Sequence, residues 1–271
     1  MLKRIWAVTL LAAMLLALAG CGAEKPEQPA ATEDPQPTPV ATATPVVEEI
    51  QSEEAVPQEL TPAQRAAAKG LPEPPDVDIS SWEFKVANSY NNILIYVPPY
   101  AGLEGQGIDE RIFDICVQLL SDARKEVPMF LASTFRNYEF QNTYYQKAVR
   151  EHGSAYEAAK VYLGPGNSDH QVGLSIEISA DPLMNCNYSP FDNSAVLETE
   201  TYQWMLDHCT EYGFILRYPE GKEEYYGTPC TAGHFRYVGK EAAEYITENN
   251  LCLEEFILLY DEDAILVPGI N

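Results

Sequence analysis

The sequence predicts an α+β fold, built as a single compact domain that follows an export signal and a long tether. Segments with helical spacing and segments with strand alternation are mixed without a regular repeat, which argues against a doubly wound parallel sheet. Aromatic residues are absent from residues 22–75 and return at Trp82. The roughly 195 residues that follow are enough to build one well-formed core.

The first 20 residues have the features of an export signal. Lys3 and Arg4 precede an apolar run at residues 5–17, which is too short for a membrane-spanning helix of about 20 residues. The run leads into Leu-Ala-Gly-Cys, which resembles the lipobox of bacterial lipoproteins. We therefore expect residues 1–20 to be removed and Cys21 to be lipidated. The alternative is an ordinary secretory signal in which this cysteine is incidental.

Residues 21–75 have the composition of a disordered, Pro/Ala/Glu-rich tether. They hold eleven of the chain's 20 prolines and no aromatic residue, so they cannot form a core. A short helix at residues 62–69 is possible, but its apolar face is only alanine. The domain is expected at residues 76–271.

The charge of the chain limits its partners. Lys and Arg number 17 against 41 Asp and Glu, a net charge of −24. Such an acidic chain is not expected to bind nucleic acid, and an anionic membrane surface repels it. We therefore expect an extracytoplasmic protein held at the cell membrane by its N-terminal lipid.

Within the domain, periodicity predicts a series of strands and helices. Strands are expected at residues 93–97, 127–133, 174–178, 214–218 and 234–238. Helices are expected at residues 109–125, 138–151, 198–211 and 240–249, the last followed by a short apolar ending. Asp109 can cap the first of these helices. Residues 174–178 alternate, so Glu177 points away from the core face of its strand.

Few residues are available for a metal or acid–base site, because the chain has four histidines: His152, His170, His208 and His234. His152 suits a helix end, and His208 a helix surface. His170 lies in a turn-rich stretch just before the strand that carries Glu177, and His234 begins another strand. Two imidazoles and a carboxylate, with a fourth position left to water, form the ligand set of a catalytic zinc site.

Five cysteines remain after Cys21, an odd number, so they cannot all pair with one another. Cys116 has helical spacing with neighbouring apolar residues and is expected in the core. The other four could form disulfides in an oxidising compartment, with three possible connectivities. We favour Cys186 with Cys209 and Cys230 with Cys252. The alternative for Cys230 is a metal-bound thiolate.

Four segments, in order, resemble motifs of one enzyme family. Residues 168–177 resemble Ser-x-His-x-x-Gly-x-Ala-x-Asp, and residues 133–141 resemble Ser-Gly-Tyr-Arg-Ser-x-x-x-Gln. Residues 212–219 and 234–239 match the last two motifs of the same family. The family is the D-alanyl-D-alanine carboxypeptidases related to vancomycin resistance (peptidase family M15). The resemblance spans about residues 80 to 250, and it implies a small mixed or antiparallel sheet flanked by helices.

The resemblance also implies a zinc site that cleaves peptidoglycan stem peptides. The residues carried over by position are Arg136, Gln141, Ser168, His170, Glu177 and His234. The two histidines and the glutamate would hold zinc, which lowers the pKa of its water and polarises the scissile carbonyl. The arginine would stabilise negative charge on that carbonyl. Gln141 and Ser168 would bind the stem peptide, and the protein is expected to be a monomer.

The sequence departs from the family pattern at the general base. The family has Glu-Pro-Trp-His at the last ligand, whereas this chain has Thr at position 231. A positioned acid–base group is typically worth about a hundred- to ten-thousandfold in rate. Asp169, Glu223 and Glu224 lie in flanking segments and are candidate replacements. The substitution of Asp by Glu177 is milder, because zinc accepts either carboxylate.

The sequence leaves three alternative functions open, of which we favour the first. The first is a zinc carboxypeptidase that hydrolyses the terminal D-Ala amide, with activity reduced by Thr231. The second is a noncatalytic module that captures stem peptides. The third, a solute-binding lipoprotein, shares the membrane attachment and the tether but not the four motifs.

Overall fold

The computed structural model describes residues 59–182 and 194–269. The predicted export signal, Cys21 and Cys186 lie outside the described residues. The chain divides into one unit at residues 1–54 and another at residues 55–271, and every element below belongs to the second. In the described ranges, no helix has the length and apolar character needed to cross a membrane.

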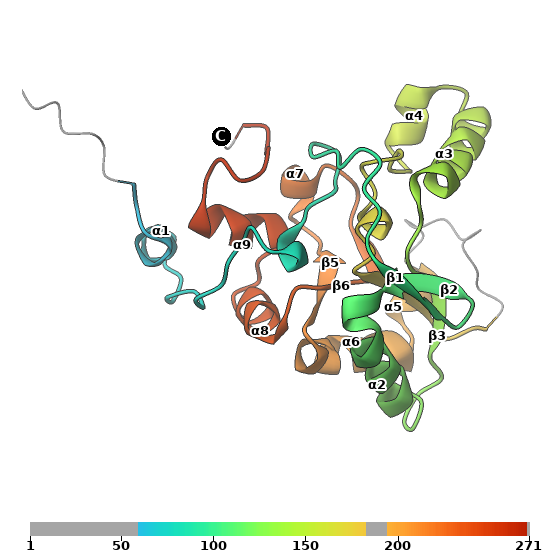
Figure 1. Ribbon diagram of the computed structural model, residues 1–271, viewed down its shortest axis with the longest axis horizontal. Coiled ribbons are helices and arrows are strands. Elements are labelled where there is room, and N and C mark those ends of the chain that lie inside the picture. Colours follow the sequence, from blue (N-terminus) through green and yellow to red (C-terminus); the bar gives the residue numbers. More distant parts are fainter. Residues whose placement is uncertain (1–58, 183–193, 270–271) are drawn as a thin grey trace, which may run out of the picture. The chain divides into compact units, whose positions relative to one another are not determined.

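The second unit contains helices and strands in mixed order (Figure 1). The α-helices are α1 (Pro62–Ala68), α2 (Phe113–Ala123), α3 (Tyr138–His152), α4 (Ala155–Ala159), α5 (Ser194–Leu197), α6 (Glu200–His208), α7 (Glu223–Tyr226), α8 (Lys240–Glu248) and α9 (Leu253–Tyr260). The 3₁₀-helices are η1 (Trp82–Phe84), η2 (Glu110–Ile112), η3 (Asp169–Val172) and η4 (Cys209–Tyr212). The strands are β1 (Tyr100–Leu103), β2 (Gln106–Asp109), β3 (Phe130–Ser133), β4 (Ser175–Ser179), β5 (Phe214–Tyr218) and β6 (Thr231–Tyr237).

The central sheet has four strands in the order β3-β4-β6-β5, and every neighbouring pair is antiparallel. This confirms the predicted α+β class. The register places Glu177 of β4 opposite His234 of β6 on one side and opposite Ser133 of β3 on the other. Residues directly opposite each other in a sheet share a face. The pairing of β3, β4 and β6 therefore brings Ser133, Glu177 and His234 together on one face of the sheet.

Helices cover the sheet from two directions. Helices α2 and α6 contribute Leu119, Trp204 and Met205 to a core that also contains Ile176 and Ile178 of β4. Helices α8 and α9 form a second core with the outer strand β5. This second core includes Ala243, Ile246, Phe256, Ile257 and Ile215. Ile176 and Ile178 are buried, as predicted, so Glu177 lies on the opposite face.

Helix α1 belongs to the folded unit, which therefore includes residues before position 76, the predicted start of the domain. Ala66 is fully buried in the core formed by α8 and α9. The Arg65 guanidinium donates to the Tyr260 carbonyl at the end of α9, at 2.9 Å. Thr61 and Gln64 form a capping box that starts the helix. A helix whose apolar face is only alanine can pack here because α8 and α9 form the surface that it packs against.

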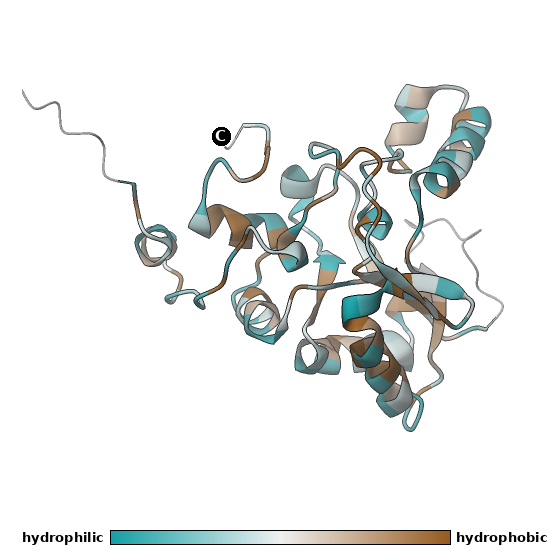
Figure 2. Ribbon diagram, in the orientation of Figure 1, coloured by the Kyte–Doolittle hydropathy of each residue, from teal (hydrophilic) through white to brown (hydrophobic). Residues whose placement is uncertain are grey.

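Most predicted elements are present, with one clear error. Residues 93–97 were expected to form a strand, but they form a loop in which Leu94 has φ +54°. The Gln171 amide donates to the carbonyls of Leu94 and Tyr96, in place of a neighbouring strand. The predicted helix at residues 138–151 is α3, which is largely hydrophilic (Figure 2) and buries Gln141 and Ala148.

The predicted disulfides are wrong for the described cysteines. Cys209 and Cys252 are free thiols, as is Cys116, which lies fully buried in the core as expected. Cys252 is the N-cap residue of α9 and packs with Tyr218 and Tyr226. Its sulfur therefore fills a small apolar cluster instead of forming a bond to Cys230.

Candidate metal centre and peptide cavity

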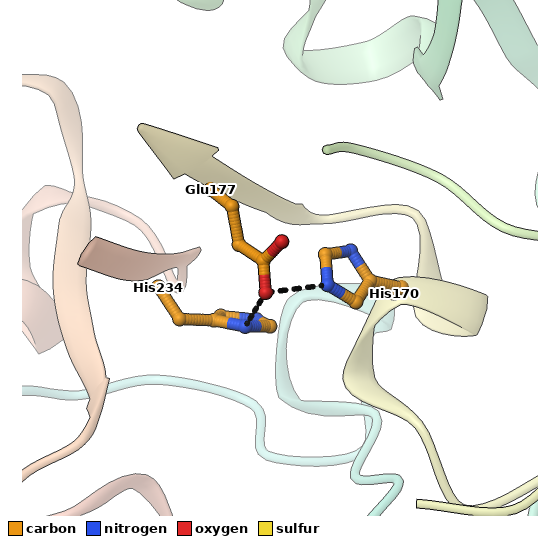
Figure 3. Close-up of side chains that lie close together, drawn as sticks. All are labelled: His170, Glu177 and His234. Carbon is orange, nitrogen blue, oxygen red and sulfur yellow. Dashed lines mark ion pairs between the residues drawn. The ribbon is translucent and has the colours of Figure 1, made fainter. Parts of the chain in front are cut away.

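Three side chains from three elements converge on the sheet face described above. His170 comes from η3, Glu177 from β4 and His234 from β6 (Figure 3). Glu177 Oε1 lies between the two imidazoles, 3.2 Å from His170 Nε2 and 3.5 Å from His234 Nδ1. One ligand atom from each residue lies within 4.8 Å of the other two. A single ion can therefore reach all three.

A glycine turn aims His170 at the other two ligands. Gly173 ends η3 with φ +87°, a conformation that side chains disfavour. A Cβ atom there would lie 2.6 Å from Pro98 Cγ. The chain can therefore turn from η3 directly into β4 and bring His170 beside Glu177.

The far side of each imidazole faces an oxygen atom of the protein. His170 Nδ1 donates to the Thr134 carbonyl at 2.6 Å, which leaves Nε2 with its lone pair toward Glu177. His234 Nε2 lies 3.6 Å from Asp169 Oδ2, so its Nδ1 faces Glu177. Such outer contacts fix the orientation of metal-binding histidines.

The chemistry of these residues fits zinc. His170 Nε2 is buried, and no hydrogen-bond partner for it is found among the described residues. Burial, reinforced by the positive charge of Arg136, lowers the pKa of His170 to about 4. The imidazole is therefore neutral at physiological pH, as a metal ligand must be. Together with His234 and Glu177 it offers two nitrogens and one oxygen to an ion, the donor set of catalytic zinc sites.

Glu177 remains ionised despite its burial. Burial alone raises the pKa of its carboxyl group, but its contacts with His170, then with His234 and with the guanidinium of Arg136, outweigh burial and hold the pKa well below its usual range. His234 shows the same balance in the opposite direction. Burial lowers its pKa, and the nearby carboxylates of Asp169 and Glu177 outweigh that effect and raise it.

Arg136 lies in the segment between β3 and α3, against the ligand carboxylate. One of its terminal nitrogens is 3.2 Å from Glu177 Oε2, and its Nε donates to Ser133 Oγ at 2.8 Å. The side chain is 5% exposed. The two oxygens of Glu177 therefore have different neighbours, the histidines on one side and the guanidinium on the other.

The structure brings all six predicted domain-site residues to one small cavity. Its lining is Arg136, Gln141, Tyr162, Leu163, Ser168, His170, Glu177, Tyr218, Thr228, Thr231 and His234. Gln141 is buried on α3 and donates to the Leu163 carbonyl at 2.7 Å. Arg136 and its neighbours also line a larger adjoining groove of about 760 Å³. The lipidation residue Cys21 lies outside the described part of the chain.

Among its described lining residues, the cavity has no replacement for the general base that the family resemblance predicts. Thr231 begins β6, is buried, and lies opposite Tyr218. Among the described lining residues, Glu177 is the single carboxylate. Glu223 and Glu224 lie on α7 and do not line the cavity. A proton acceptor in the position of the family's glutamate is therefore missing from the described lining.

Asp169, the third acid considered as a base, is committed to a buried ion-pair network. Burial raises the pKa of its carboxyl group, but the charges of Arg236 and Arg217 outweigh burial and hold the pKa well below its usual range. Arg236 donates to Asp169 Oδ1 at 2.5 Å, and Arg217 donates to the same oxygen at 3.2 Å. Arg217 also forms a two-point pair with Glu254 of α9 at 2.6 and 3.0 Å. Both arginines are therefore paired with buried acids.

Sequence reasoning missed Tyr218 and Thr228 as lining residues. Tyr218 ends β5, in one of the blocks that carry the family resemblance, and its ring stands at 73° to that of His234 with centroids 5.0 Å apart. Alternation along β5 could have identified it, because Tyr218 lies opposite Thr231, the position of the missing base.

The fold and the donor set place the chain among the zinc metallopeptidases of mixed α+β architecture. The family model for VanY, D-alanyl-D-alanine carboxypeptidase, matches residues 106–240. The chain is 32% identical to the solved structure of VanYB in complex with D-Alanine-D-Alanine, with a TM-score of 0.55, covering 65% of this chain and 98% of that one. The chain belongs to the VanY D-alanyl-D-alanine carboxypeptidase family.

Further relatives agree. A VanY variant solved with Zn(II) is also 32% identical, with a TM-score of 0.54, covering 65% of this chain and 99% of that chain. A D-alanyl-D-alanine carboxypeptidase of Enterococcus faecalis is 33% identical over 162 residues, 56% of each chain. The putative carboxypeptidase YodJ of Bacillus subtilis is 35% identical over 143 residues, 52% of this chain and 50% of that protein. The match thus spans about half the length of these two curated relatives.

Proposed function

We propose that this protein is a zinc-dependent carboxypeptidase that removes the terminal D-Ala from peptidoglycan stem peptides, at a rate limited by the lack of the usual base. The observation that carries the proposal is the convergence of His170, Glu177 and His234 within 4.8 Å on one sheet face. Zinc held by these residues would polarise the scissile carbonyl. The family relation supplies the substrate class.

The chain's own residues account for binding and charge stabilisation. Arg136 is buried at the cavity wall and presents a cation that favours negative charge on the attacked oxygen. Gln141 Oε1 is a buried acceptor for which no protein donor is found among the described residues, so it can receive a peptide N–H. Ser168, 3% exposed, also lines the cavity.

Thr231 supports the proposal of low turnover. A threonine hydroxyl cannot take up a proton near neutral pH, and loss of a positioned base typically costs about a hundred- to ten-thousandfold in rate. The carboxylate in the described lining, that of Glu177, is held by Arg136 and faces the two histidines. Slow release of D-Ala is therefore expected.

The test combines metal analysis with product release. The zinc content of the purified mature chain is measured, followed by D-Ala release from muropeptides whose stems end in D-Ala-D-Ala. Thr231→Glu should raise kcat by about a hundredfold or more. Thr231→Gln, which has a similar size and no basic group, should not. No release by the wild type at full zinc occupancy would overturn the peptidase proposal.

A second function, capture of stem peptides without cleavage, is favoured by one specific observation. Among the described lining residues, the sole carboxylate is the one engaged by Arg136. Binding of muropeptides without release of D-Ala, together with a gain of release in Thr231→Glu, would support this function over the first.

We also propose that the protein is exported and attached to the membrane by a lipid on Cys21. The support is the lipobox-like end of the predicted signal. Metabolic labelling with a radioactive fatty acid should mark the wild type and not Cys21→Ser. Equal labelling of both would contradict lipidation at this residue.

A further inference from the structure

Asn88 is a buried polar residue that joins separate parts of the fold. It lies in the segment between η1 and β1, its side chain has no solvent exposure, and it is not part of the described cavity lining. No motif that carries the family resemblance contains it. Burying an amide costs free energy unless its donors and acceptors are paired, so its partners show what it holds together.

The orientation of the Asn88 amide follows from its partners. Its Oδ1 accepts from the backbone N–H groups of Tyr90 and Asn91, each at 2.9 Å. A backbone N–H can only donate, so the atom facing it is the oxygen and the amide nitrogen points the other way. That nitrogen donates to Glu254 Oε1 of α9 at 2.8 Å. Asn88 therefore closes a turn with one atom and binds α9 with the other.

The contact with α9 meets the ion-pair network behind the metal centre. Glu254 Oε1 accepts from both Asn88 and Arg217, the latter at 2.6 Å. Arg217 also donates to Asp169 Oδ1 at 3.2 Å, and Asp169 Oδ2 lies 3.6 Å from His234 Nε2. The three residues between Asn88 and His234 are all fully buried. A continuous series of polar contacts thus leads from Asn88 to this imidazole.

A second contact joins Asn88 to the turn that carries the other histidine. Asn167 Nδ2 donates to the Asn88 carbonyl at 2.6 Å. Asn167 stands three positions before His170, and its Oδ1 accepts from Asn92 at 2.8 Å. The segment at residues 88–92 therefore supports both histidines, one through a side-chain amide and the other through a backbone carbonyl.

We infer that Asn88 is a positioning residue that acts on the metal centre through Glu254. By fixing one oxygen of that carboxylate, it limits the positions open to Arg217 and thus to Asp169. A carboxylate behind a metal-binding imidazole sets the orientation of the ring, so a shift of Asp169 would turn His234. The inference rests on the proposed function, since it requires that the centre binds zinc.

The experiment separates an effect on zinc from an effect on stability. Zinc affinity is measured for the purified mature chain by competition with a chelator, well below the melting temperature. Asn88→Ser keeps an acceptor for the turn, but its hydroxyl is one bond shorter and does not reach Glu254. This variant should bind zinc about two- to thirtyfold more weakly, the range over which network residues affect a distant site. The absorption bands of bound cobalt(II), which report ligand geometry, should shift as well.

Tyr260→Phe, on the same helix as Glu254, is the matched control. The Tyr260 hydroxyl donates to the Pro75 carbonyl at 2.5 Å, outside the network. Loss of this hydrogen bond should lower the melting temperature and leave the zinc affinity and the cobalt spectrum as in the wild type. A zinc affinity of Asn88→Ser equal to that of the control would overturn the inference.

Glu254→Gln tests the same connection without altering the turn. It should weaken zinc binding, and adding Asn88→Ser to it should cause little further loss, because the two residues act in series. Additive losses would contradict the inference. So would an unchanged affinity in Glu254→Gln, a result that does not depend on the folding of Asn88→Ser. These outcomes leave the proposed function intact, whereas failure of the wild type itself to bind zinc would overturn both.

Discussion

Asp169 lies directly behind His234, with Oδ2 3.6 Å from Nε2, on the side of the imidazole opposite Glu177. The two residues link the buried ion-pair network to the candidate metal centre. Outer carboxylates of this kind orient a metal-binding imidazole and typically contribute about 10- to 100-fold to metal affinity.

Asp169→Asn should therefore weaken zinc binding by about 10- to 100-fold. It should also destabilise the fold by about 3–5 kcal/mol, because Arg217 and Arg236 would remain buried with less compensating charge. Zinc affinity is measured by competition with a chromophoric chelator, and stability by urea unfolding. Asp122→Asn, an acid outside the site that pairs with Lys125, is the matched control. An unchanged zinc affinity in Asp169→Asn would show that His234 needs no such support.

Removal of metal should lower thermal stability. A ligand present at about 100 to 1,000 times its dissociation constant stabilises the folded state by about 3–4 kcal/mol. For a domain of this size that is about 5–15 °C in melting temperature, at about 2–4 °C per kcal/mol. Differential scanning calorimetry with and without a chelator measures the shift. His170→Ala should show no shift, whereas His208→Ala, on the surface of α6, should behave as wild type.

Two buried cysteines should resist alkylation in the folded protein. Burial raises the pKa of Cys116 and of Cys209 to about 12. At pH 8 only about one thiol in ten thousand is then ionised, and the thiolate is the reactive form. Mass spectrometry after iodoacetamide treatment at pH 8 should find both unmodified, and both alkylated once urea is added. Rapid labelling of either in the native protein would contradict the described core.

Asp122 should titrate at unusually low pH. Its pKa is lowered to about 2, first by Lys125, then by Gln118 and by Tyr212. Because the folded-state pKa lies below the unfolded value near 3.8, this group stabilises the fold above pH 4 and loses that effect as the pH falls toward 2. Carbon-13 NMR of labelled aspartates measures the midpoint. Lys125→Ala should move it upward, and a midpoint near 4 in the wild type would contradict the interaction.

The metal-site residues could be predicted because residue types that bind metals stand out in short local stretches of the sequence. His170 and Glu177 are separated by one turn and part of one strand, and alternation alone shows which face Glu177 takes. The pairing of β4 with β6, which brings His234 opposite Glu177, is a contact distant in sequence. Ordered family motifs supplied it, whereas periodicity could not.

Elements that depend on long-range contacts or unusual turns were missed. The hairpin of β1 and β2 turns at Glu104 and Gly105, both with positive φ, and Glu-Gly is not a strong sequence signal for such a turn. Helix α9 was expected only as a short apolar ending. Its start depends on Glu255, which accepts from the Cys252 backbone N–H, and its burial depends on a surface formed by α8 and β5.

The two-point pair between Arg217 and Glu254 has a practical consequence for defining the catalytic unit. The family match ends at residue 240, before Glu254 on α9. A shortened chain that stopped there would retain every expected zinc ligand and the whole central sheet. It would lose the carboxylate that neutralises Arg217, and with it a support for Asp169 behind His234. In this protein, the smallest segment that can hold the metal site in place extends through the last helix.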